Sequence, residues 1–180
     1  MRIIGGKYQR RILKPPTNLP VRPTTDMAKE ALFNVLGHIS ELEGAKVLDL
    51  FAGTGSISIE FASRGADRVV AVDLSFKCIE YIKKVKNDLE MENLFPLRSD
   101  VFRYLKGCKT QFDIIFADPP YALEGIEEIH TLVFEKSLLT SSGILIIEHP
   151  ATINFQNFDG FVKERKYGKV HFSFFEGQAD

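Results

Sequence analysis

The sequence predicts one α/β domain built on a doubly wound, mostly parallel sheet. From residue 45 onward, short apolar runs alternate with segments of helical periodicity. The apolar runs are nearly continuous, which is typical of parallel strands whose two faces are both covered by helices. Residues 161–175 change to an alternation with period two, which indicates an antiparallel hairpin. A chain of 180 residues is long enough for one domain with a full core.

The N-terminal region precedes this alternating pattern. Residues 2–13 are predicted to form a short hairpin, because Gly5-Gly6 is a turn signal between two strand-like runs. The next stretch, 14–23, holds four prolines in ten residues, which excludes a helix or a central strand. Residues 24–26 all carry N-cap oxygens, and apolar residues follow at helical spacing. A first helix is therefore predicted over about 26–38.

The alternating region is expected to contain five strands with a helix between each pair. The strands are expected at 46–51, 68–73, 94–98, 112–117 and 143–149. The helices are expected at 56–64, from a cap at Ser75 to about Met91, at 101–106 and at 124–136. Two further strands, 161–167 and 169–175, are separated by Gly168 and complete a seven-stranded sheet with an antiparallel C-terminal hairpin and helices on both faces.

Charge is distributed unevenly along the chain. Residues 1–25 hold six basic and no acidic side chains, whereas the remaining 155 residues hold 17 basic and 24 acidic ones. A basic arm on an acidic body favours a polyanionic partner, because each lysine or arginine that meets a phosphate releases a counterion. A solvated terminus without a partner is the alternative. We divide the chain accordingly into a basic N-terminal hairpin or arm, 1–25, and a main domain, 26–180.

Several function classes find no support in the sequence. No stretch reaches the roughly 18–20 apolar residues of a membrane span, and no apolar segment follows Arg2 as it would in a secretory signal. Cys78 and Cys108 are expected to be free thiols of a reducing compartment. The four histidines show no metal-ligand spacing. We therefore expect a cytoplasmic protein, monomeric by default at this size, without a metal or a membrane partner.

A glycine-containing motif, Asp49-Leu-Phe-Ala-Gly-Thr-Gly55, falls where the first strand passes into a helix. Glycine allows the chain to turn sharply there and lets a ligand approach the backbone closely. The dinucleotide-binding pattern Gly-x-Gly-x-x-Gly is incomplete, because Ser58 takes the place of its third glycine. The carboxylate of Asp49 instead suits a cofactor that carries an ammonium group. A plain strand-to-helix turn is the alternative interpretation.

Two further carboxylates follow the next two strands. Asp73 closes a strand 18 residues after Gly55, where an acid accepts the ribose hydroxyls of a nucleoside. NAD would fit Asp73 equally well, and a helix N-cap is the structural alternative. Asp100, followed by Val101, begins the next helix. It is either the cap of that helix or the acceptor for an adenine amino group, and the residues alone leave both open.

The sequence Asp118-Pro-Pro-Tyr121 directly follows the fourth strand. Two consecutive prolines end strand pairing and stiffen the loop, so that fixed acceptors can be held above a cofactor. An amino group conjugated with a nucleobase is a poor nucleophile. The Asp118 carboxylate and the Pro119 carbonyl can accept its two N–H groups and free its lone pair for attack on an activated methyl group. Tyr121 would stack on the base. The alternative is a rigid loop without chemistry.

Over essentially its full length, the chain resembles the RsmD-type guanine-N2 methyltransferases of small-subunit ribosomal RNA. The matching segments are Arg2-Ile-Ile-Gly-Gly-Lys7, Arg22-Pro-Thr-Thr-Asp26, Glu30-Ala-Leu-Phe-Asn34, Asp49-Leu-Phe-Ala-Gly-Thr-Gly55, Ser63-Arg-Gly-Ala66 and Asp118-Pro-Pro-Tyr121. Met27 and Lys29 stand where the family often has arginines, so we expect a reduced charge on the RNA side. Asp73 stands where the family often has glutamate.

The resemblance implies a Rossmann-like class I methyltransferase fold and transfer of a methyl group from S-adenosylmethionine to a guanine N2 amine, within a small-subunit assembly particle. It implies cofactor contacts at Asp49, Phe51, Gly53, Gly55, Asp73, Leu74, Asp100 and Val101. It implies catalysis by the loop residues Asp118, Pro119, Pro120 and Tyr121. Together with the charge pattern, it predicts RNA contacts at Arg2, Lys7, Arg10, Arg11, Arg22, Thr24 and Thr25.

Three other functions remain as alternatives. The first is a methyltransferase of the same chemistry that acts on adenine N6 or cytosine N4 in DNA, or on a glutamine amide, because the loop at Asp118 reads only a conjugated amino group. The second is an NAD-dependent oxidoreductase, which Ser58 disfavours. The third is a non-catalytic RNA-binding module with this fold, which would leave the set of acids and the double proline unexplained.

Overall fold

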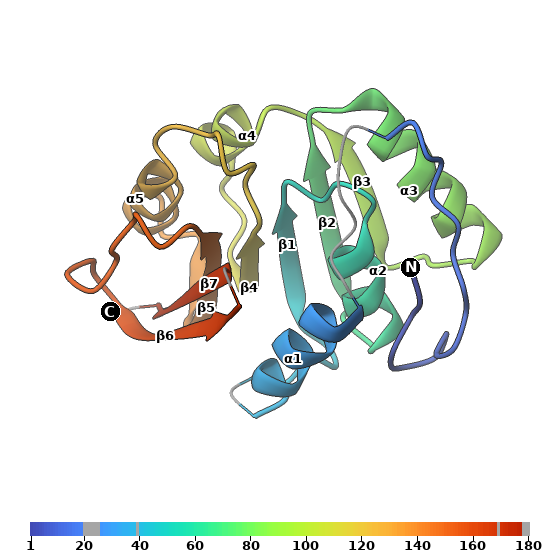
Figure 1. Cartoon of the computed structure of the whole chain (residues 1–180), viewed down its shortest axis with the longest axis horizontal. Helices are drawn as coiled ribbons and strands as arrows, with labels where there is room; N and C mark the ends of the chain where they lie inside the picture. The colour runs from blue at the N-terminus through green and yellow to red at the C-terminus, as the bar shows by residue number, and fades with distance from the viewer. Residues whose placement is uncertain (20–25, 39, 169, 178–180) are drawn as a thin grey trace.

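Figure 1 shows the computed structural model of the chain, in which a twisted central sheet carries helices on both faces. The structure describes residues 1–19, 26–38, 40–168 and 170–177. The helices are α1 (Asp26–Leu36), α2 (Ser56–Ser63), α3 (Phe76–Asp88), α4 (Val101–Gly107) and α5 (Glu127–Glu135). The strands are β1 (Lys46–Leu50), β2 (Arg68–Asp73), β3 (Leu94–Arg98), β4 (Phe112–Ala117), β5 (Leu139–His149), β6 (Phe161–Tyr167) and β7 (Val170–Glu176).

The seven strands form one sheet in the order β3-β2-β1-β4-β5-β7-β6. The first five strands are parallel to their neighbours, and β7 runs antiparallel between β5 and β6. The predicted seven-stranded, mostly parallel sheet with an antiparallel C-terminal hairpin is therefore confirmed. The strand order reverses between β1 and β4, and open α/β sheets bind their ligands at the carboxyl ends of the strands beside such a reversal.

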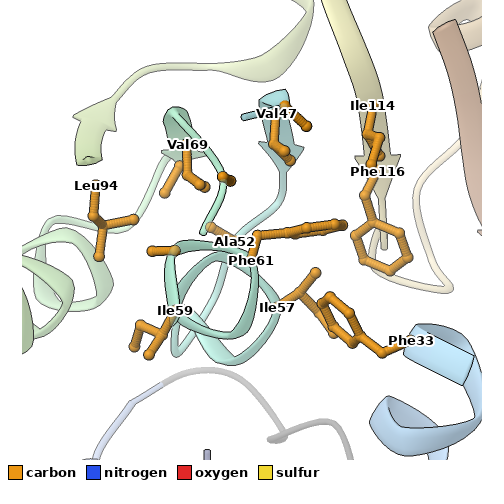
Figure 2. Packing of buried hydrophobic residues seen from close by; sticks show 14 of the residues in the cluster. Phe33, Val47, Ala52, Ile57, Ile59, Phe61, Val69, Leu94, Ile114 and Phe116 are labelled. Atoms are coloured by element: carbon orange, nitrogen blue, oxygen red, sulfur yellow. The ribbon is translucent and has the colours of Figure 1, made fainter. Parts of the chain in front are cut away.

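Alternate residues of the parallel strands enter two separate cores, because successive side chains of a strand point to opposite faces. On one face, α1, α2 and α3 cover residues such as Val47, Val69 and Ile114. Figure 2 shows this core, where the rings of Phe33 and Phe61 meet edge to face with their centroids 4.7 Å apart. On the other face, α4 and α5 cover the intervening strand residues.

Four element boundaries differ from the predicted ones by two or more residues. Helix α1 ends at Leu36, before Gly37, and α3 ends at Asp88 because Glu90 adopts a left-handed conformation with φ 51°. Helix α5 starts at Glu127 rather than at 124, since Gly125 has φ 75°. Strand β5 begins at Leu139 rather than at 143, because its first residues pair with β4 before a register shift. None of the described helices is long and apolar enough to cross a membrane.

The N-terminal segment, residues 1–13, turns back on itself and packs on α2. The turn is closed by a single antiparallel bridge between Arg2 and Ile12 rather than by two strands. The backbone N–H groups of Ile4 and Gly5 donate to the Glu60 carboxylate instead, at 2.9 and 2.8 Å. At Gly6, with φ 76°, an added Cβ would lie 1.8 Å from a backbone oxygen of α2. We call residues 1–13 the N-terminal loop.

A buried ion pair joins α1 and α2 next to this loop. Lys29 of α1 is 1% exposed, and its Nζ lies 3.5 Å from a carboxylate oxygen of the fully buried Glu60. The same Nζ donates to the Arg2 carbonyl at 2.6 Å, and Arg64 donates to Glu60 at 2.8 Å. Lys29 therefore pairs inside the protein and adds no charge to the surface there.

Candidate active site

The loop between β1 and α2 turns through three residues with positive φ. Phe51, Gly53 and Gly55 have φ values of 62°, 54° and 73°. The turn lies under the neighbouring helix, because a Cβ added at Gly55 would be 2.7 Å from Ile82 Cγ1 of α3. The loop is tied to β2, since the Ala52 N–H donates to a β2 carbonyl at 3.0 Å. The glycine motif is thus a rigid feature at the reversal of the strand order.

Asp49 is buried beneath this loop, with 2% of its surface exposed. The Ser58 hydroxyl of α2 donates to its carboxylate, so the residue that breaks the dinucleotide-binding pattern serves the acid instead. Burial raises the pKa of Asp49 to about 7, and the negative charges of Asp118 and Asp73 act in the same direction. Within the described residues, Asp49 has no salt bridge. A cationic ligand group would supply the charge that it lacks.

Asp73 ends β2 next to the same loop. One of its carboxylate oxygens accepts the Gly53 N–H at 2.8 Å, and the other accepts the Ser75 N–H at 2.7 Å. Each carboxylate oxygen can accept a second hydrogen bond, so these contacts leave acceptor capacity. Ser75 itself caps α3, where its hydroxyl accepts the Cys78 N–H at 3.4 Å. Asp73 therefore orients the turn and is not the cap of α3.

An open hollow of about 550 Å³ lies beside Asp73. It is lined by Leu74, Leu97, Arg98, Ser99, Asp100 and Arg103. Leu74 is 63% exposed and offers an apolar face, while Asp100 caps α4 by accepting the Arg103 N–H at 2.9 Å. The Val101 side chain is buried in the core on the α4–α5 face. A flat apolar ring with an amino group could enter this hollow and reach a carboxylate.

The Asp118-Pro-Pro-Tyr121 loop leaves the sheet at the carboxyl end of β4, directly beside β1. The Asp118 N–H reaches the carbonyl of the last β1 residue, Leu50, at 3.4 Å. Pro119 is buried and Pro120 exposed, and the Pro120 carbonyl accepts the Leu123 N–H at 2.8 Å. Tyr121 is 58% exposed, so that its ring is free to meet a planar ligand. The loop thus presents an acid and an aromatic ring above the glycine motif.

A third member of this cluster, Glu148, was missed by the sequence analysis. It lies near the end of β5, is 8% exposed, and accepts a hydrogen bond from the Tyr121 hydroxyl at 3.2 Å. The negative charge of Asp118 acts on it from the neighbouring loop. A glutamate in the otherwise apolar run Ile144-Leu-Ile-Ile-Glu-His149 was the available signal. The register that pairs β4 with β5 places it next to the Asp118-Pro-Pro-Tyr121 loop.

Glu148 and Asp118 are two carboxyl groups that the strand register places next to each other. Burial and the Asp118 charge raise the pKa of Glu148 to about 8. Burial raises the pKa of Asp118 to about 6, and hydrogen bonding with Glu148 opposes that shift. At neutral pH the pair therefore shares one proton and carries one negative charge.

The basic residues of the N-terminal loop lie on the face of the sheet that α1, α2 and α3 cover. Arg2, Lys7, Arg10 and Arg11 are exposed, and Arg2 lies 3.8 Å from Asp26 of α1. The predicted RNA contacts at Arg22, Thr24 and Thr25 lie outside the described residues. In the part of the chain that the structure describes, no group of three or more His, Cys, Asp or Glu side chains could hold a metal ion.

Known proteins share both the sequence and the fold. A family model described as Conserved hypothetical protein 95 matches residues 1–176. YlbH of Bacillus subtilis (strain 168), a proposed rRNA methyltransferase, is 37% identical over 153 residues, which are 83% of this chain and 82% of that protein. Ribosomal RNA small subunit methyltransferase D of Escherichia coli (strain K12) is 30% identical over 148 residues, which are 82% of this chain and 74% of that protein.

Among solved structures, the Escherichia coli protein yhhF, a proposed methyltransferase, has a TM-score of 0.87 at 27% identity and covers 100% of this chain and 99% of its own. The 16S rRNA N2 G1207 methyltransferase of T. thermophilus, solved with AdoMet and guanosine, has a TM-score of 0.69 at 22% identity, over 89% of this chain and 45% of its own, and shares the fold. With a family match over residues 1–176 and the similarity of these relatives, this chain belongs to the RsmD-type family of class I, S-adenosylmethionine-dependent methyltransferases.

Proposed function

We propose that this chain transfers a methyl group from S-adenosylmethionine to the exocyclic N2 amine of a guanine in small-subunit ribosomal RNA. The observation that carries the proposal is the position of Asp118 and Tyr121, at the carboxyl end of β4 and beside the glycine motif. Relatives named ribosomal RNA small subunit methyltransferase D, at 29–30% identity, support the RNA substrate.

The residues around the reversal of the strand order fit S-adenosylmethionine. Its ammonium group would meet the buried Asp49 carboxylate, its ribose Asp73, and its adenine ring the hollow beside Leu74 and Asp100. Phe51, Gly53, Gly55 and Val101 would contribute backbone and packing contacts to the same site. The bound cofactor supplies an electrophilic methyl group on a sulfonium and leaves as a neutral thioether.

Asp118 performs the central task in this proposal. Its carboxylate and the Pro119 carbonyl accept the two N–H groups of the target amine, which localises the nitrogen lone pair and aims it at the methyl group. Pro120 keeps the loop rigid, and Tyr121 stacks on the base. After transfer the nitrogen carries a positive charge and releases one proton, which the Asp118 carboxylate can accept.

Guanine suits Asp118 better than adenine or cytosine does. The guanine edge presents two adjacent donors, N1–H and N2–H, whereas the amino groups of adenine and cytosine each lie beside a ring nitrogen that is an acceptor. An ionised carboxylate offers acceptors only, so it matches a pair of donors. We propose that the proton shared by the two carboxyls resides on Glu148, which has the higher pKa, and that Asp118 is the ionised partner at neutral pH. Adenine N6 or cytosine N4 would leave one ring acceptor facing a carboxylate oxygen.

The RNA side of the proposal rests on the N-terminal loop. Its exposed residues Arg2, Lys7, Arg10 and Arg11 can contact phosphates, and Arg22, Thr24 and Thr25 would extend that contact. The described residues form one domain around a single sheet. We therefore propose that it acts as a monomer in the cytoplasm, and that its target is RNA within a small-subunit assembly particle.

The test is transfer of labelled methyl from S-adenosylmethionine to small ribosomal subunits that lack the modification, followed by nucleoside analysis. We expect N2-methylguanosine, and a loss of about 10²–10³-fold in the rate with Asp118→Ala. Cofactor binding by that variant, measured by calorimetry, should persist. Label in N6-methyladenine or in protein would reject the guanine substrate, and no transfer by a protein that binds the cofactor would reject the enzyme.

A further inference from the structure

Glu148 is a buried acid that the chemistry above does not use directly. It is contributed by β5, while Asp118 and Tyr121 belong to the loop after β4. The register pairs Ala117 with Ile147, so Glu148 comes next to Asp118 at the same edge of the sheet. On its other side, β7 places Phe172 opposite Glu148. The acid is therefore enclosed between the catalytic loop and an aromatic residue.

We propose that Glu148 is a positioning residue, which donates a hydrogen bond from its protonated carboxyl to Asp118 and accepts one from the Tyr121 hydroxyl. The second contact is 3.2 Å long, and the first is inferred from the register that places Glu148 beside Asp118 and from the burial of Glu148. This inference rests on the proposed function, because Glu148 acts through Asp118 and Tyr121 and does not itself touch the amine or the cofactor.

The neutral form of Glu148 is what makes the arrangement useful. A neutral carboxylic acid offers one donor, so it can hold the Asp118 carboxylate in one orientation without adding a second negative charge. Its carbonyl oxygen remains available for the Tyr121 hydroxyl, which fixes the ring that meets the base. One side chain thereby sets both the acceptor and the stacking surface before the substrate arrives.

The groups that face Glu148 come from three elements. Asp118 and Tyr121 approach it from the loop after β4. Burial and the charge of Asp118 raise the pKa of Glu148, and the hydrogen bond from Tyr121 lowers it. From β7 it meets Phe172, and beyond that strand the register places Arg165 of β6. The side chain of His149, the next residue of β5, points to the opposite face. Its Nε2 shares a hydrogen bond with the Ser173 hydroxyl there.

These neighbours define the pH range over which the arrangement holds. Above about pH 6 Asp118 is ionised and can accept from the amine. As the pH rises through about 8, Glu148 loses its proton, its donor disappears, and two carboxylates face each other. The wild-type methylation rate should therefore be highest between these values and fall on the alkaline side.

The decisive experiment compares single-turnover methylation rates of small subunits from pH 6 to pH 9.5 for the wild type, Glu148→Gln and Glu148→Leu. The glutamine amide keeps a donor for Asp118 and an acceptor for Tyr121 but does not titrate, so we expect a rate within about tenfold of wild type and no alkaline fall near pH 8. Leucine removes both bonds and should lower the rate about 10–100-fold at every pH.

Two control variants separate positioning from general effects. Glu164→Gln changes a glutamate of β6 that bonds His171, at 2.7 Å, and should leave the pH profile unchanged. Tyr121→Phe keeps the ring but removes its hydroxyl, so the alkaline fall, which depends on the Glu148–Asp118 pair, should remain. An alkaline fall that persists unchanged in Glu148→Gln would overturn the proposal.

A second readout needs no activity. The carboxyl of Glu148 can be followed in the free protein by ¹³C NMR of labelled glutamate, with its resonance assigned by its absence in Glu148→Gln. We expect titration near pH 8 and a dependence on Asp118, so that Asp118→Asn shifts it. Titration in the ordinary range of a glutamate, around pH 4.3, would reject the role of Glu148 even if methyl transfer is observed. If no RNA is methylated at all, the proposed function fails, while the NMR result still decides the arrangement.

Discussion

We predict that Asp49 couples the affinity for the cofactor to pH. Its carboxyl lies beneath the glycine motif, receives the Ser58 hydroxyl, and has a pKa of about 7 because burial disfavours its charge. An ammonium group in the site favours the ionised form. Binding of such a group should therefore ionise Asp49 and release a proton in the neutral range.

We expect the Kd for S-adenosylmethionine to rise as the pH falls from about 8 through 7, by up to about tenfold per pH unit. The reason is that the protonated fraction of Asp49 must lose its proton before it can pair. Calorimetry in buffers of different ionisation enthalpy measures both the Kd and the proton release. Asp49→Asn should bind more weakly than wild type at pH 8, with a Kd that no longer rises as the pH falls from 8 to 6. A wild-type Kd that stays flat from pH 8 to pH 6 would contradict the role of Asp49.

The residues that sequence alone could predict are those whose type is unusual for their position. Asp49, Asp73 and Asp118 are acids at strand ends, where a ligand rather than packing explains a carboxylate. Glu148 has the same property but lies inside a strand, and only the β4–β5 register shows that it meets Asp118. The burial of Lys29 could not be predicted from the sequence, because lysines are seldom buried and its partner Glu60 is 31 positions away.

At the scale of elements, the N-terminal loop is attached to α2 by polar contacts rather than by strand pairing. Glu60 accepts the N–H groups of Ile4 and Gly5, and the Ser63 hydroxyl donates to the Gly5 carbonyl at 2.6 Å. Lys29 of α1 contacts the same Glu60 carboxylate and also donates a hydrogen bond to the Arg2 carbonyl of the loop. The helix thereby fixes the position of a loop that carries four of the exposed basic residues.

Lys29→Met should destabilise the protein by about 3 kcal/mol, because it leaves the buried Glu60 with one cation fewer. The matched control is Lys84→Met on α3, whose pair with Asp88 has side chains 69% and 56% exposed and should contribute less than about 0.5 kcal/mol. Urea denaturation with the linear extrapolation measures both free energies of unfolding. Equal, small effects of the two substitutions would show that the Lys29–Glu60 pair contributes little.

Elements with a strong periodic signal were predictable, and their ends were less so. The helix at 75–91 was predicted from its apolar spacing, but its true end at Asp88 depends on Glu90 in the left-handed region, which no local signal indicated. The predicted hairpin over 2–13 contains one antiparallel bridge in place of two strands, and its Ile4 and Gly5 N–H groups donate to Glu60. A partner 55 positions away cannot be read from the local pattern of the loop.

At the scale of the whole molecule, the residues of the candidate site gather at one edge of the sheet, where the parallel strands have their carboxyl ends. The glycine motif, Asp73 and the Asp118 loop converge where the strand order reverses. The N-terminal loop sits on the α1–α3 face, and α4 and α5 cover the other face. A nucleic acid whose base contacts Tyr121 can therefore contact the basic residues of the N-terminal loop only on the α1–α3 face of the sheet.

This asymmetry predicts the salt dependence of RNA binding. Replacing Lys7, Arg10 and Arg11 of the N-terminal loop by glutamine should weaken binding to unmodified small-subunit RNA and flatten the plot of log affinity against log salt. For single-stranded contacts the slope should fall by about 0.7 per residue, or about 2 in total. The matched control replaces Lys106, Lys109 and Lys136, which are exposed on the α4–α5 side. Filter binding at several salt concentrations measures both slopes. Because the two variants lose the same net charge, a difference between them reports phosphate contacts. Equal slopes would place the RNA away from the N-terminal loop.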